Sequence, residues 1–445
     1  MTRSFQIVSD PSKRVEATLT VPADKSISHR AIILSSLAKG TTTIHNFLAA
    51  QDTLHTLQIF QQMGVNINRD GATNTVTVTG VGLHGLRSSS TVLDVGNSGT
   101  GIRLILGILS GQPFKTTITG DASIQKRPMK RVVDPLTLMG ATFSLTPTGT
   151  APVTVTGKVA LNAIDYAMPV SSAQVKSAIL FAGLYANGPT VVRDPGRSRD
   201  HTERMMRHFG VQVENPDATS VIVFPPPIDL VSPKELTIPS DISSAAFWMV
   251  LAAIRPNTIL TLLNVGLNPT RTGIIDVMTA MKVNINVSDI RQVEGEPIGD
   301  ITVKSSRDGL TAVTLDQSTF DMATFIDEIP IIAVLAAFAS GVTTIRDAQE
   351  LRVKESDRIQ TTLAMLKAFG VVADELPDGL RITGGTVQHV GTVESHGDHR
   401  IAMAGSILSL AIEGRSGIID VDCVDTSYPG FAQGLSLMAA EVIYS

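Results

Sequence analysis

Cysteine is almost absent from this chain, whose 445 residues include a single one, Cys423. A lone cysteine excludes an internal disulfide and any zinc cluster built on cysteines, and we interpret it as a small core residue rather than a nucleophile. Aromatic residues make up only 4% of the chain, which leaves little surface on which nucleic-acid bases could stack.

Positive charge is not in excess either, because the formal net charge is −5 and charged residues are only 17% of the chain. A protein that binds nucleic acid neutralises phosphates with a basic face, so we expect no nucleic-acid partner. Any cations that bind anions must therefore be concentrated in a few places.

Long apolar runs are missing as well. The opening MTRSFQIVSD lacks the apolar core of a signal peptide, and the most apolar stretches, residues 329–339 and 247–254, are far shorter than the roughly 20 residues that span a bilayer. We therefore expect a soluble, cytoplasmic protein without a membrane partner. No Walker loop, dinucleotide fingerprint or metal-ligand spacing occurs, so we expect no cofactor and no metal.

A repeat in the sequence indicates the fold. Six stretches, among them VPADKSISHRAIILSSLAKGTTTIHNF and MPVSSAQVKSAILFAGLYANGPTVVRD, each combine a small polar segment, an apolar helix of about ten residues, a break and a β-branched strand. The polar segments recur 69 to 86 residues apart, near Lys25, Asn97, Ser172, Asp241, Asp327 and Asp398.

Five of the six units continue into a second, one-sided helix that is followed by a turn and a strand. Four of these helices end in a glycine that can adopt the left-handed C-cap conformation, at Gly64, Gly140, Gly210 and Gly370. The pattern predicts an α/β (α+β) fold of six βαβαββ-type units. We expect three units in each of two similar domains with parallel helices, and a boundary near Pro239.

In every unit the polar segment lies at the N-terminus of the apolar helix, where free N–H groups and the helix dipole favour anions. Parallel helices would bring these N-termini together on one face of each domain, and two such faces across a hinge would form an electropositive cleft. The alternative is that the segments are only N-caps, the usual role of Ser, Asp and Asn there. Six such segments, several with Lys or Arg, favour an anion site.

One stretch concentrates charge. LRVKESDRI, residues 351–359, places five charged side chains between Arg352 and Arg358, and it is flanked by the apolar IPIIAVLAAFASG and the helix-like TTLAMLKAFG. Charge of both signs between such segments is either a solvated cap or a place where an anion is held and processed.

The motifs DKSISHR, GNSGTGIRL, QKRPM, SSAQVKSA, RSRDHTE, LRVKESDR and GDHRIAMA together resemble the 5-enolpyruvylshikimate-3-phosphate (EPSP) synthase family, in order from about residue 20 to residue 432. The forms GNSGT, SAQVKSA and RDHTE are more similar to the family's second bacterial class. The resemblance implies the enolpyruvyl transferase fold, with one domain of residues 23–239 and a discontinuous domain of residues 1–22 and 240–445 joined by a hinge.

The same resemblance implies the activity of a 3-phosphoshikimate 1-carboxyvinyltransferase. Such an enzyme transfers the enolpyruvyl group of phosphoenolpyruvate to the 5-hydroxyl of shikimate 3-phosphate and releases phosphate. The reaction belongs to the shikimate pathway, toward chorismate and the aromatic amino acids. We expect a monomer whose phosphoenolpyruvate pocket also admits the herbicide glyphosate.

Both substrates carry phosphate, which suits guanidinium groups, hydroxyls and a glycine that lets backbone approach closely. For phosphoenolpyruvate the resemblance implies Lys25, Gly99, Arg127, Gln174, Arg358 and Arg400. For shikimate 3-phosphate it implies Lys25, Ser26, Arg30, Ser171, Ser172, Gln174, Arg199, Asp327 and Lys354. Alternatively, each arginine forms a surface ion pair, Gly99 is a plain turn glycine, and Ser171 is a helix N-cap.

The chemistry needs one base to accept the hydroxyl proton and one acid to protonate C3 of phosphoenolpyruvate. The resemblance makes Asp327 the candidate base and Glu355 the proton donor, with Lys25 as a partner in proton transfer. The alternative for Glu355 is that it simply neutralises Lys354 and Arg358.

The sequence departs from the family pattern at two positions, and three other functions remain as alternatives. DTSYPGF has no lysine where first-class members have one, and Glu350 replaces an asparagine, so we assign neither a role.

The sister enolpyruvyl transferase of cell-wall synthesis uses a loop cysteine, whereas Cys423 lies in a strand-like IIDVDCVD. RNA 3′-phosphate cyclases need a nucleotide and a reactive histidine, for which only His396 and His399 are candidates late in the chain. A non-enzymatic clamp around nucleic acid is disfavoured by the net charge.

Overall fold

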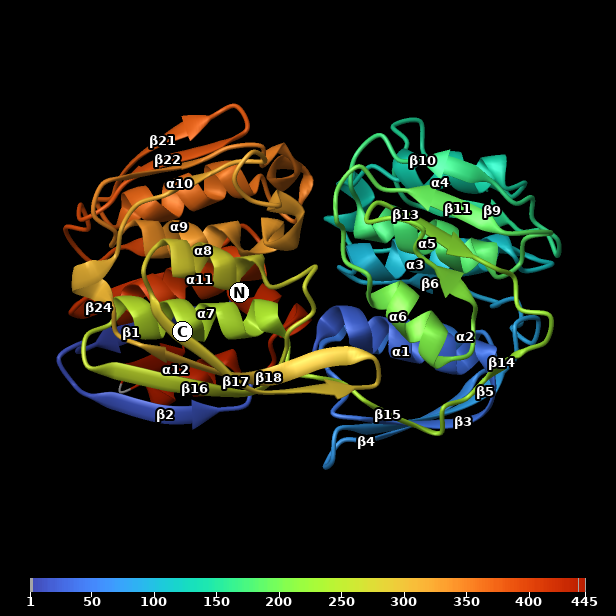
Figure 1. The fold of residues 1–445 in the computed structure, drawn as a ribbon, viewed down its shortest axis with the longest axis horizontal. Coiled ribbons are helices and arrows are strands. Elements are labelled where there is room, and N and C mark those ends of the chain that lie inside the picture. Colours follow the sequence, from blue (N-terminus) through green and yellow to red (C-terminus); the bar gives the residue numbers. More distant parts are fainter. Residues whose placement is uncertain (1–2, 439, 445) are drawn as a thin grey trace. The chain divides into compact units, whose positions relative to one another are not determined.

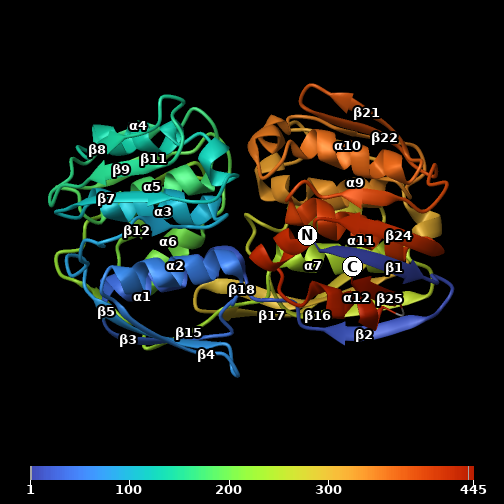
Figure 2. The same cartoon turned by 180° about the vertical axis from the view of Figure 1, so that it is seen from behind.

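The computed structural model of this chain describes residues 3–438 and 440–444. The chain divides into two compact units, drawn in Figure 1 and from behind in Figure 2. Unit 1 consists of Met1–Pro22, Ser240–Arg291 and Pro297–Ser445, and unit 2 of Ala23–Pro239 and Gln292–Glu296. Each unit has its own hydrophobic core.

The strands of unit 2 form three small mixed sheets. They are β3 (Ala38–His45), β4 (Asn66–Asp70), β5 (Thr75–Val81), β6 (Leu93–Asp94), β7 (Lys115–Thr119), β8 (Thr142–Ser144), β9 (Val153–Thr156), β10 (Asp165–Ala167), β11 (Thr190–Arg193), β12 (Val213–Glu214), β13 (Ser220–Val223), β14 (Leu230–Val231) and β15 (Glu235–Thr237). The strand orders are β14-β3-β5-β4, with β15 also on β3, then β6-β7-β9-β8 and β10-β11-β13-β12. In each order the first pair is parallel and the later pairs are antiparallel, while β15 pairs with β3 in parallel.

Unit 1 repeats this arrangement. Its strands are β1 (Ser4–Ser9), β2 (Val15–Leu19), β16 (Thr258–Gly266), β17 (Asn284–Val293), β18 (Glu296–Lys304), β19 (Thr314–Leu315), β20 (Val342–Ile345), β21 (Val372–Leu376), β22 (Gly379–Thr383), β23 (Thr392–Glu394), β24 (Gly414–Ile419) and β25 (Ala440–Tyr444). They form sheets with the orders β2-β16-β18-β17, β19-β20-β22-β21 and β23-β24-β1-β25. Here too the first pair is parallel and the second antiparallel.

Two helices accompany each sheet. In unit 2 they are α1 (Lys25–Leu37), α2 (Gln51–Gln62), α3 (Gly99–Ser110), α4 (Lys130–Leu138), α5 (Ala173–Gly183) and α6 (His201–His208). In unit 1 they are α7 (Ile242–Ile254), α8 (Gly273–Ala280), α9 (Ile329–Ala336), α10 (Arg358–Ala368), α11 (His399–Leu410) and α12 (Phe431–Leu437). Among the described residues, none of these helices is long and apolar enough to cross a membrane.

The predicted arrangement of six βαβαββ-type units is confirmed, with one addition. The sixth unit also has a second helix, α12, which we did not predict because its seven residues are too few for a periodicity to show. The four glycines expected to end second helices all have positive φ, from 74° at Gly370 to 105° at Gly140. Each therefore occupies the left-handed conformation that stops a helix.

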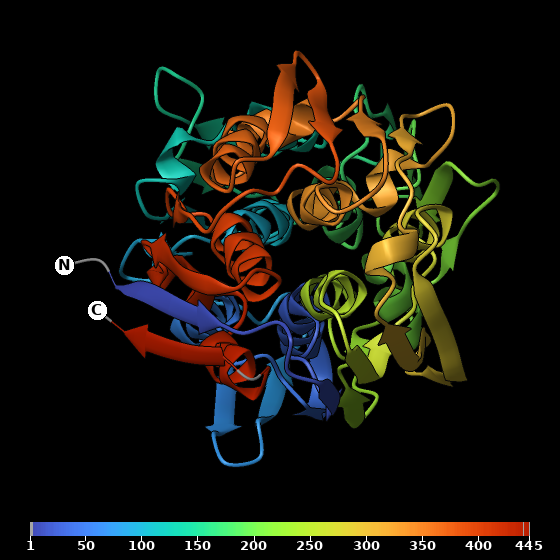
Figure 3. The same cartoon turned by 90° about the vertical axis from the view of Figure 1, so that its left-hand side faces the viewer.

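The first helices of the units are apolar on all sides because they form the centre of each unit. Every residue of α7 is buried, and α7, α9 and α11 contact one another. Figure 3 shows these three helices, in yellow-green, light orange and red, nearly end-on, so their axes are close to parallel. The starts of α7, α9 and α11 lie together, because Glu328 accepts hydrogen bonds from Ser243 and from Arg400, and the three helices of this unit are therefore parallel, as expected.

The chain passes between the units at residues 22/23 and 239/240, and the short segment 292–296 within the last part of unit 1 also belongs to unit 2. In unit 2 the Asp24 amide donates to the Pro239 carbonyl at 2.8 Å, and in unit 1 the Asp241 amide donates to the Pro22 carbonyl at 2.9 Å. As a result β15 pairs with β3, β2 pairs with β16, and β1 lies between β24 and β25. Three repeat units thus take a strand from outside their own stretch of sequence.

Candidate active site

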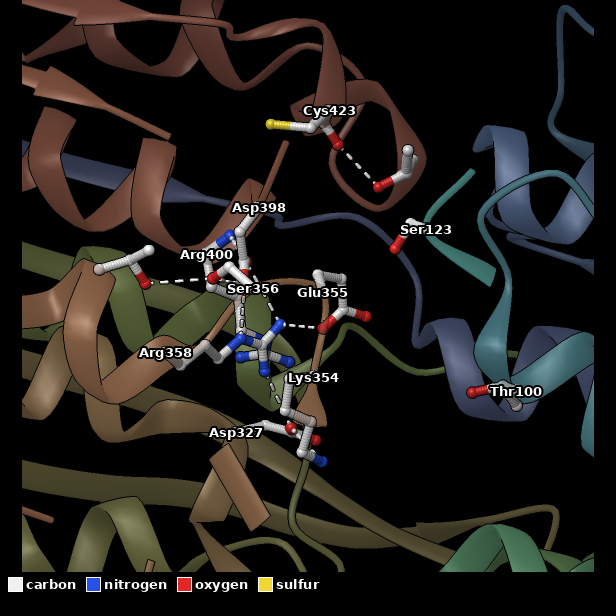
Figure 4. A network of polar contacts seen from close by, with 12 residues as sticks. Thr100, Ser123, Asp327, Lys354, Glu355, Ser356, Arg358, Asp398, Arg400 and Cys423 are labelled. Atoms are coloured by element: carbon white, nitrogen blue, oxygen red, sulfur yellow. Dashed lines mark hydrogen bonds and ion pairs between the residues drawn. The ribbon is translucent and has the colours of Figure 1, made fainter. Parts of the chain in front are cut away.

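The guanidinium of Arg358 is the centre of an ionic cluster in unit 1, shown in Figure 4. Its Nε donates to Asp398 Oδ2 at 2.8 Å, its Nη2 to Glu355 Oε2 at 2.6 Å and its Nη1 to Asp327 Oδ1 at 3.2 Å. The Arg358 side chain is 2% exposed. Burial alone would lower the pKa of Arg358, but the charges of Asp398, Glu355 and Asp327 raise it above its ordinary value, so the guanidinium stays protonated.

The cluster forms because three helix starts meet. Asp398 caps α11 by accepting a hydrogen bond from the Arg400 amide at 2.9 Å, and Arg358 is the first residue of α10. Asp327 lies in the short helix η4 (Ile326–Glu328), directly before α9. The charged stretch 351–359 is therefore not merely a solvated cap, although its Arg352 does form a surface ion pair with Glu375.

Lys354 and Glu355 differ in their partners. Lys354 Nζ lies 3.1 Å from Asp327 Oδ1, and the lysine side chain is 27% exposed. Glu355 instead contacts Arg358, and it is 16% exposed. The alternative role of Glu355 was to neutralise both Lys354 and Arg358. Of these two contacts, the structure has the one with Arg358. Both side chains retain enough exposure to meet a ligand.

Arg400 has a buried partner that the sequence analysis missed. Its Nη1 donates to Glu328 Oε1 at 3.2 Å, and the Glu328 side chain is fully buried. Glu328 also accepts a hydrogen bond from Ser243 at the start of α7, and Arg271 donates to that serine. The available signal was DEIPII, because an acid directly before an apolar helix lies where the polar segments of the other repeats lie.

In unit 2 the predicted lysine and first arginine lie on α1. Lys25 Nζ is 3.1 Å from Asp52 Oδ2 on α2, with the lysine side chain 21% exposed and the carboxylate 7%. Arg30 is buried and donates to Thr202 Oγ1 at 2.6 Å, to Ser177 Oγ at 2.8 Å and to the Ser26 carbonyl at 2.9 Å. Arg30 therefore links α1 to α5 and α6, and Ser26 beside it is half-buried.

Gly99 and Arg127 are neighbours, as their assignment to one ligand requires. A methyl group built on Gly99 would lie 2.4 Å from Arg127 Nη1, so the absence of a side chain there makes room for the guanidinium. Arg127 Nη2 donates to Ser123 Oγ at 3.5 Å, and Arg127 is 7% exposed. Gly99 is thus more than a plain turn glycine.

Arg103 is a second residue that the sequence analysis missed. Its Nη1 donates to the Gly99 carbonyl at 3.2 Å and to Gln174 Oε1 at 2.5 Å, and Gln174 Nε2 donates to Thr100 Oγ1 at 3.0 Å. Arg103 therefore joins the start of α3 to the start of α5 and orients the predicted Gln174. An arginine within the apolar run GIRLILGIL was the available signal.

The two predicted serines before α5 have different roles. Ser172 is the N-cap, because its Oγ accepts a hydrogen bond from the Val175 amide at 3.4 Å. The N-cap alternative for Ser171 is therefore wrong. Ser171 Oγ is buried and has no hydrogen-bond partner among residues 3–438 and 440–444. It faces the loop between β11 and α6, where the half-buried Arg199 also lies.

Cys423 does not lie in a strand, contrary to our expectation. It belongs to the short helix η6 (Asp422–Thr426), and its Sγ donates to the Asp420 carbonyl at 3.2 Å. Burial raises the pKa of its thiol to about 12, so the nucleophilic thiolate is scarce at neutral pH. Within the described part of the chain, no three His, Cys, Asp or Glu side chains are grouped so as to hold a metal ion.

Comparisons with a family model and with known proteins indicate one and the same family. Residues 9–435 match the family model described as EPSP synthase (3-phosphoshikimate 1-carboxyvinyltransferase). The 3-phosphoshikimate 1-carboxyvinyltransferase of Desulforamulus reducens is 47% identical over 439 residues, which cover 98% of this chain and 100% of that protein. The protein of the same name from Alkalilimnicola ehrlichii is 49% identical over 426 residues, covering 95% of this chain and 93% of that protein.

Solved structures agree. The EPSP synthase of Acinetobacter baumannii has a TM-score of 0.86 and 42% identity, with 99% of this chain and 100% of that chain covered. The enolpyruvyl transferase NikO from Streptomyces tendae has a TM-score of 0.80 at 18% identity, over 100% of this chain and 99% of that chain. At that identity the likeness to NikO shows the fold alone.

Proposed function

The chain belongs to the EPSP synthase family, and from this membership we propose how its own side chains perform the reaction. Its activity is that of a 3-phosphoshikimate 1-carboxyvinyltransferase, in the shikimate pathway that supplies the aromatic amino acids. Family membership replaces the three alternatives considered above, namely the cell-wall transferase, the RNA cyclase and the nucleic-acid clamp.

The reaction proceeds by addition and elimination. The 5-hydroxyl oxygen of shikimate 3-phosphate bonds to C2 of phosphoenolpyruvate, the hydroxyl proton passes to a base, and C3 takes a proton from an acid. The tetrahedral adduct then loses inorganic phosphate from C2 and a proton from C3, which restores the double bond. The protein must supply one proton acceptor and one proton donor.

Asp327 is the base in this proposal. Lys354 at 3.1 Å and Arg358 at 3.2 Å favour its anionic form, which is the form that accepts a proton. Its side chain is 14% exposed, which leaves room for a substrate hydroxyl to approach. Lys354 next to it is the proposed contact for shikimate 3-phosphate.

Glu355 is the acid that protonates C3, and Lys25 assists proton transfer. In its charged form Glu355 is held by Arg358 at 2.6 Å. A protonated Glu355 has a weaker hold on the guanidinium, because the charge-assisted bond is lost. In this proposal a protonated Glu355 leaves one Nη2 hydrogen of Arg358 for phosphoenolpyruvate, while Nη2 keeps its bond to Asp398 Oδ1 at 3.3 Å.

Phosphoenolpyruvate is proposed to contact Lys25, Gly99, Arg127, Gln174, Arg358 and Arg400. Its support is geometric: Gly99 lies against the Arg127 guanidinium, and Arg103 fixes Gln174 beside the same helix start. Forked guanidinium donors match both the phosphate and the carboxylate of this ligand.

Shikimate 3-phosphate is proposed to contact Lys25, Ser26, Arg30, Ser171, Ser172, Gln174, Arg199, Asp327 and Lys354. The buried Ser171 hydroxyl, without a partner among the described residues, supports a polar ligand near α5. Arg30 donates to the Ser26 carbonyl as well as to two hydroxyls, so these bonds hold the guanidinium proposed to contact the ligand beside Ser26. The remaining finer proposals are a monomer of the second bacterial class that works in the cytoplasm, with two domains at residues 23–239 and 1–22 plus 240–445.

The observation that carries these assignments is the cluster of Asp327, Lys354 and Glu355 around Arg358. Incubating the protein with shikimate 3-phosphate and phosphoenolpyruvate, without added metal or nucleotide, should release inorganic phosphate and form the enol ether in equal amounts. Shikimate without its phosphate is the matched control and should react far more slowly. Phosphate release that required a nucleotide, or that left shikimate 3-phosphate unchanged, would contradict the proposal.

A further inference from the structure

We infer that Lys176 is a positioning residue for shikimate 3-phosphate: it fixes the loop between β11 and α6 and thereby sets where Arg199 meets the ligand. This inference rests on the proposed role of Arg199. Lys176 lies on α5, two residues after Gln174, and α5 and α6 are labelled in Figure 1. The reaction as proposed gives Lys176 no part.

The Lys176 ammonium is buried among three acceptors. Its Nζ lies 2.8 Å from Glu203 Oε1 on α6, 2.8 Å from the Ser198 carbonyl and 3.8 Å from Asp194 Oδ2. The lysine side chain is 7% exposed, and the carboxylates of Asp194 and Glu203 are 4% and 2% exposed. An ammonium has three donors, so these acceptors match its bonding capacity.

The loop that Lys176 reaches is tied from within by Asp194. Asp194 Oδ1 accepts from the Gly196 amide at 3.2 Å, and Oδ2 accepts from the amide and the hydroxyl of Ser198. These bonds shape the loop but do not fix it to a helix. The bond from Lys176 to the Ser198 carbonyl does so, and it acts on the residue directly before Arg199.

Helix packing alone does not explain the lysine. The adjacent residues, Ser177 on α5 and Thr202 on α6, hydrogen-bond to each other and to Arg30. The two helices therefore already have a polar connection beside Lys176. A buried ion pair is often no more stabilising than an apolar replacement of similar volume, so stability alone does not account for a lysine at this position. What Lys176 adds is the contact with the loop.

The test compares Lys176→Met with the double variant Lys176→Met/Glu203→Gln. Methionine keeps most of the length of the side chain without its charge, and the second change avoids leaving Glu203 buried as an unpaired anion. In both variants the KM for shikimate 3-phosphate should rise by about 10- to 100-fold, because a displaced Arg199 meets the phosphate poorly. The KM for phosphoenolpyruvate at saturating shikimate 3-phosphate, and kcat, should stay within about threefold.

Two controls separate positioning from stability. Ile179→Val perturbs the core face of the same helix and should lower the thermal midpoint without changing the KM for shikimate 3-phosphate. In an Arg199→Ala background, Lys176→Met should raise the dissociation constant of shikimate 3-phosphate by less than about twofold, because it acts through the missing arginine.

A folded double variant with the wild-type KM for shikimate 3-phosphate would overturn the inference. Equal losses in kcat and both KM values, or full additivity with Arg199→Ala, would do the same, since either indicates a general structural effect. A wild-type protein that does not use shikimate 3-phosphate would instead refute the proposed function. If both Lys176 variants fail to fold, Ser198→Pro provides the measurement, because it changes the loop's backbone while leaving Lys176 in place; an unchanged KM for shikimate 3-phosphate would then count against the inference.

Discussion

Two arginines near helix starts in each unit, Arg358 and Arg400 in unit 1 and Arg30 and Arg103 in unit 2, can be compared by the acceptors they bond. In unit 1, Arg358 contacts three carboxylates and Arg400 contacts the buried carboxylate of Glu328. In unit 2, Arg30 donates to two hydroxyls and a carbonyl, and Arg103 donates to a carbonyl and an amide oxygen. Similar repeat units, with similar helix starts, thus produce two distinct polar surroundings.

This difference suggests a division of labour. Carboxylates beside cations can change their protonation, so the unit 1 cluster suits proton transfer. Hydroxyl, carbonyl and amide oxygens orient the guanidinium groups of Arg30 and Arg103 in unit 2, an arrangement that suits the binding of phosphate and carboxylate groups. We expect substitution of the unit 1 carboxylates Asp327 and Glu355 mainly to lower turnover, and substitution of unit 2 binding residues such as Arg127 mainly to weaken binding.

The largest effect is expected for Asp327→Asn. The amide keeps the shape of the side chain but cannot accept the hydroxyl proton, so kcat should fall by about 10²- to 10⁴-fold. Shikimate 3-phosphate should still bind, as titration calorimetry would measure. Asp374→Asn, at an exposed position on β21, is the control and should leave kcat unchanged. Near-normal turnover by Asp327→Asn would mean that Asp327 is not the base.

The next largest difference is expected in the free energy of unfolding, which removal of a carboxylate should lower more in unit 1 than in unit 2. Asp398→Ala leaves the 2%-exposed Arg358 with one carboxylate fewer and α11 without its cap, and should lower the free energy of unfolding by about 3–5 kcal/mol. Asp52→Ala leaves Lys25, whose side chain is 21% exposed and can be hydrated, so the loss should be about 1 kcal/mol. Urea unfolding of both variants checks this. Equal losses would mean that the two clusters are equally dependent on their carboxylates.

Arg127→Lys tests the binding role of unit 2. A lysine keeps the charge but loses the two-pronged donor geometry, so the KM for phosphoenolpyruvate should rise by about 10- to 100-fold with a much smaller change in kcat. Steady-state kinetics with the exposed Arg69→Lys variant as control would show this. A fall in kcat at an unchanged KM would place Arg127 with the groups of unit 1 instead.

The smallest effect is expected for Gly99→Ala. Its methyl group would meet Arg127 Nη1 at 2.4 Å, and because that atom ends a flexible side chain, a small shift relieves the clash. The KM for phosphoenolpyruvate should rise by only about 2- to 10-fold. Family resemblance implies that glyphosate is the longer ligand of this pocket, so its inhibition constant should rise more. The ratio of the two constants is the measurement.

The matched control is Gly309→Ala, where a methyl group meets nothing within 4 Å. It should leave both constants unchanged. A ratio that also stayed constant in Gly99→Ala would mean that Gly99 does not line the space that distinguishes the two ligands, and its assignment to the phosphoenolpyruvate contact would be wrong.

The sequence predicted the repeat and its helices because these depend on local pattern. Apolar runs, polar helix starts and glycines such as Gly64 and Gly370 act within a few residues, and the structure has them where the pattern placed them. The contact partners of the charged side chains could not be predicted in this way. Which carboxylate meets Arg358 depends on how α9, α10 and α11 pack, and no spacing encodes that Asp398 lies 40 residues away in the chain.

The missed residues share this cause. Arg103 and Glu328 are charges inside or beside apolar helices, and their roles become visible only when their partners Gln174 and Arg400 are placed. Cys423 was misplaced because IIDVDCVD has the alternation of a strand, whereas the chain turns into η6 after Asp420, whose φ is positive. The roles of the site residues themselves came from resemblance to a family and stay proposals.

The position of β1 between β24 and β25 has a consequence for synthesis of the protein. Unit 2 is nearly continuous in sequence, so it has almost all its residues once the ribosome has passed Pro239. β1 and β24, in contrast, are about 400 residues apart. At roughly 5–20 residues per second, the nascent N-terminal strand waits roughly 20–80 s for its partners. During that interval β1 lacks the strands that pair with it in the folded unit, so a chaperone that covers β1 and β2 would act on this enzyme before the main part of unit 1, from Ser240 on, is synthesised.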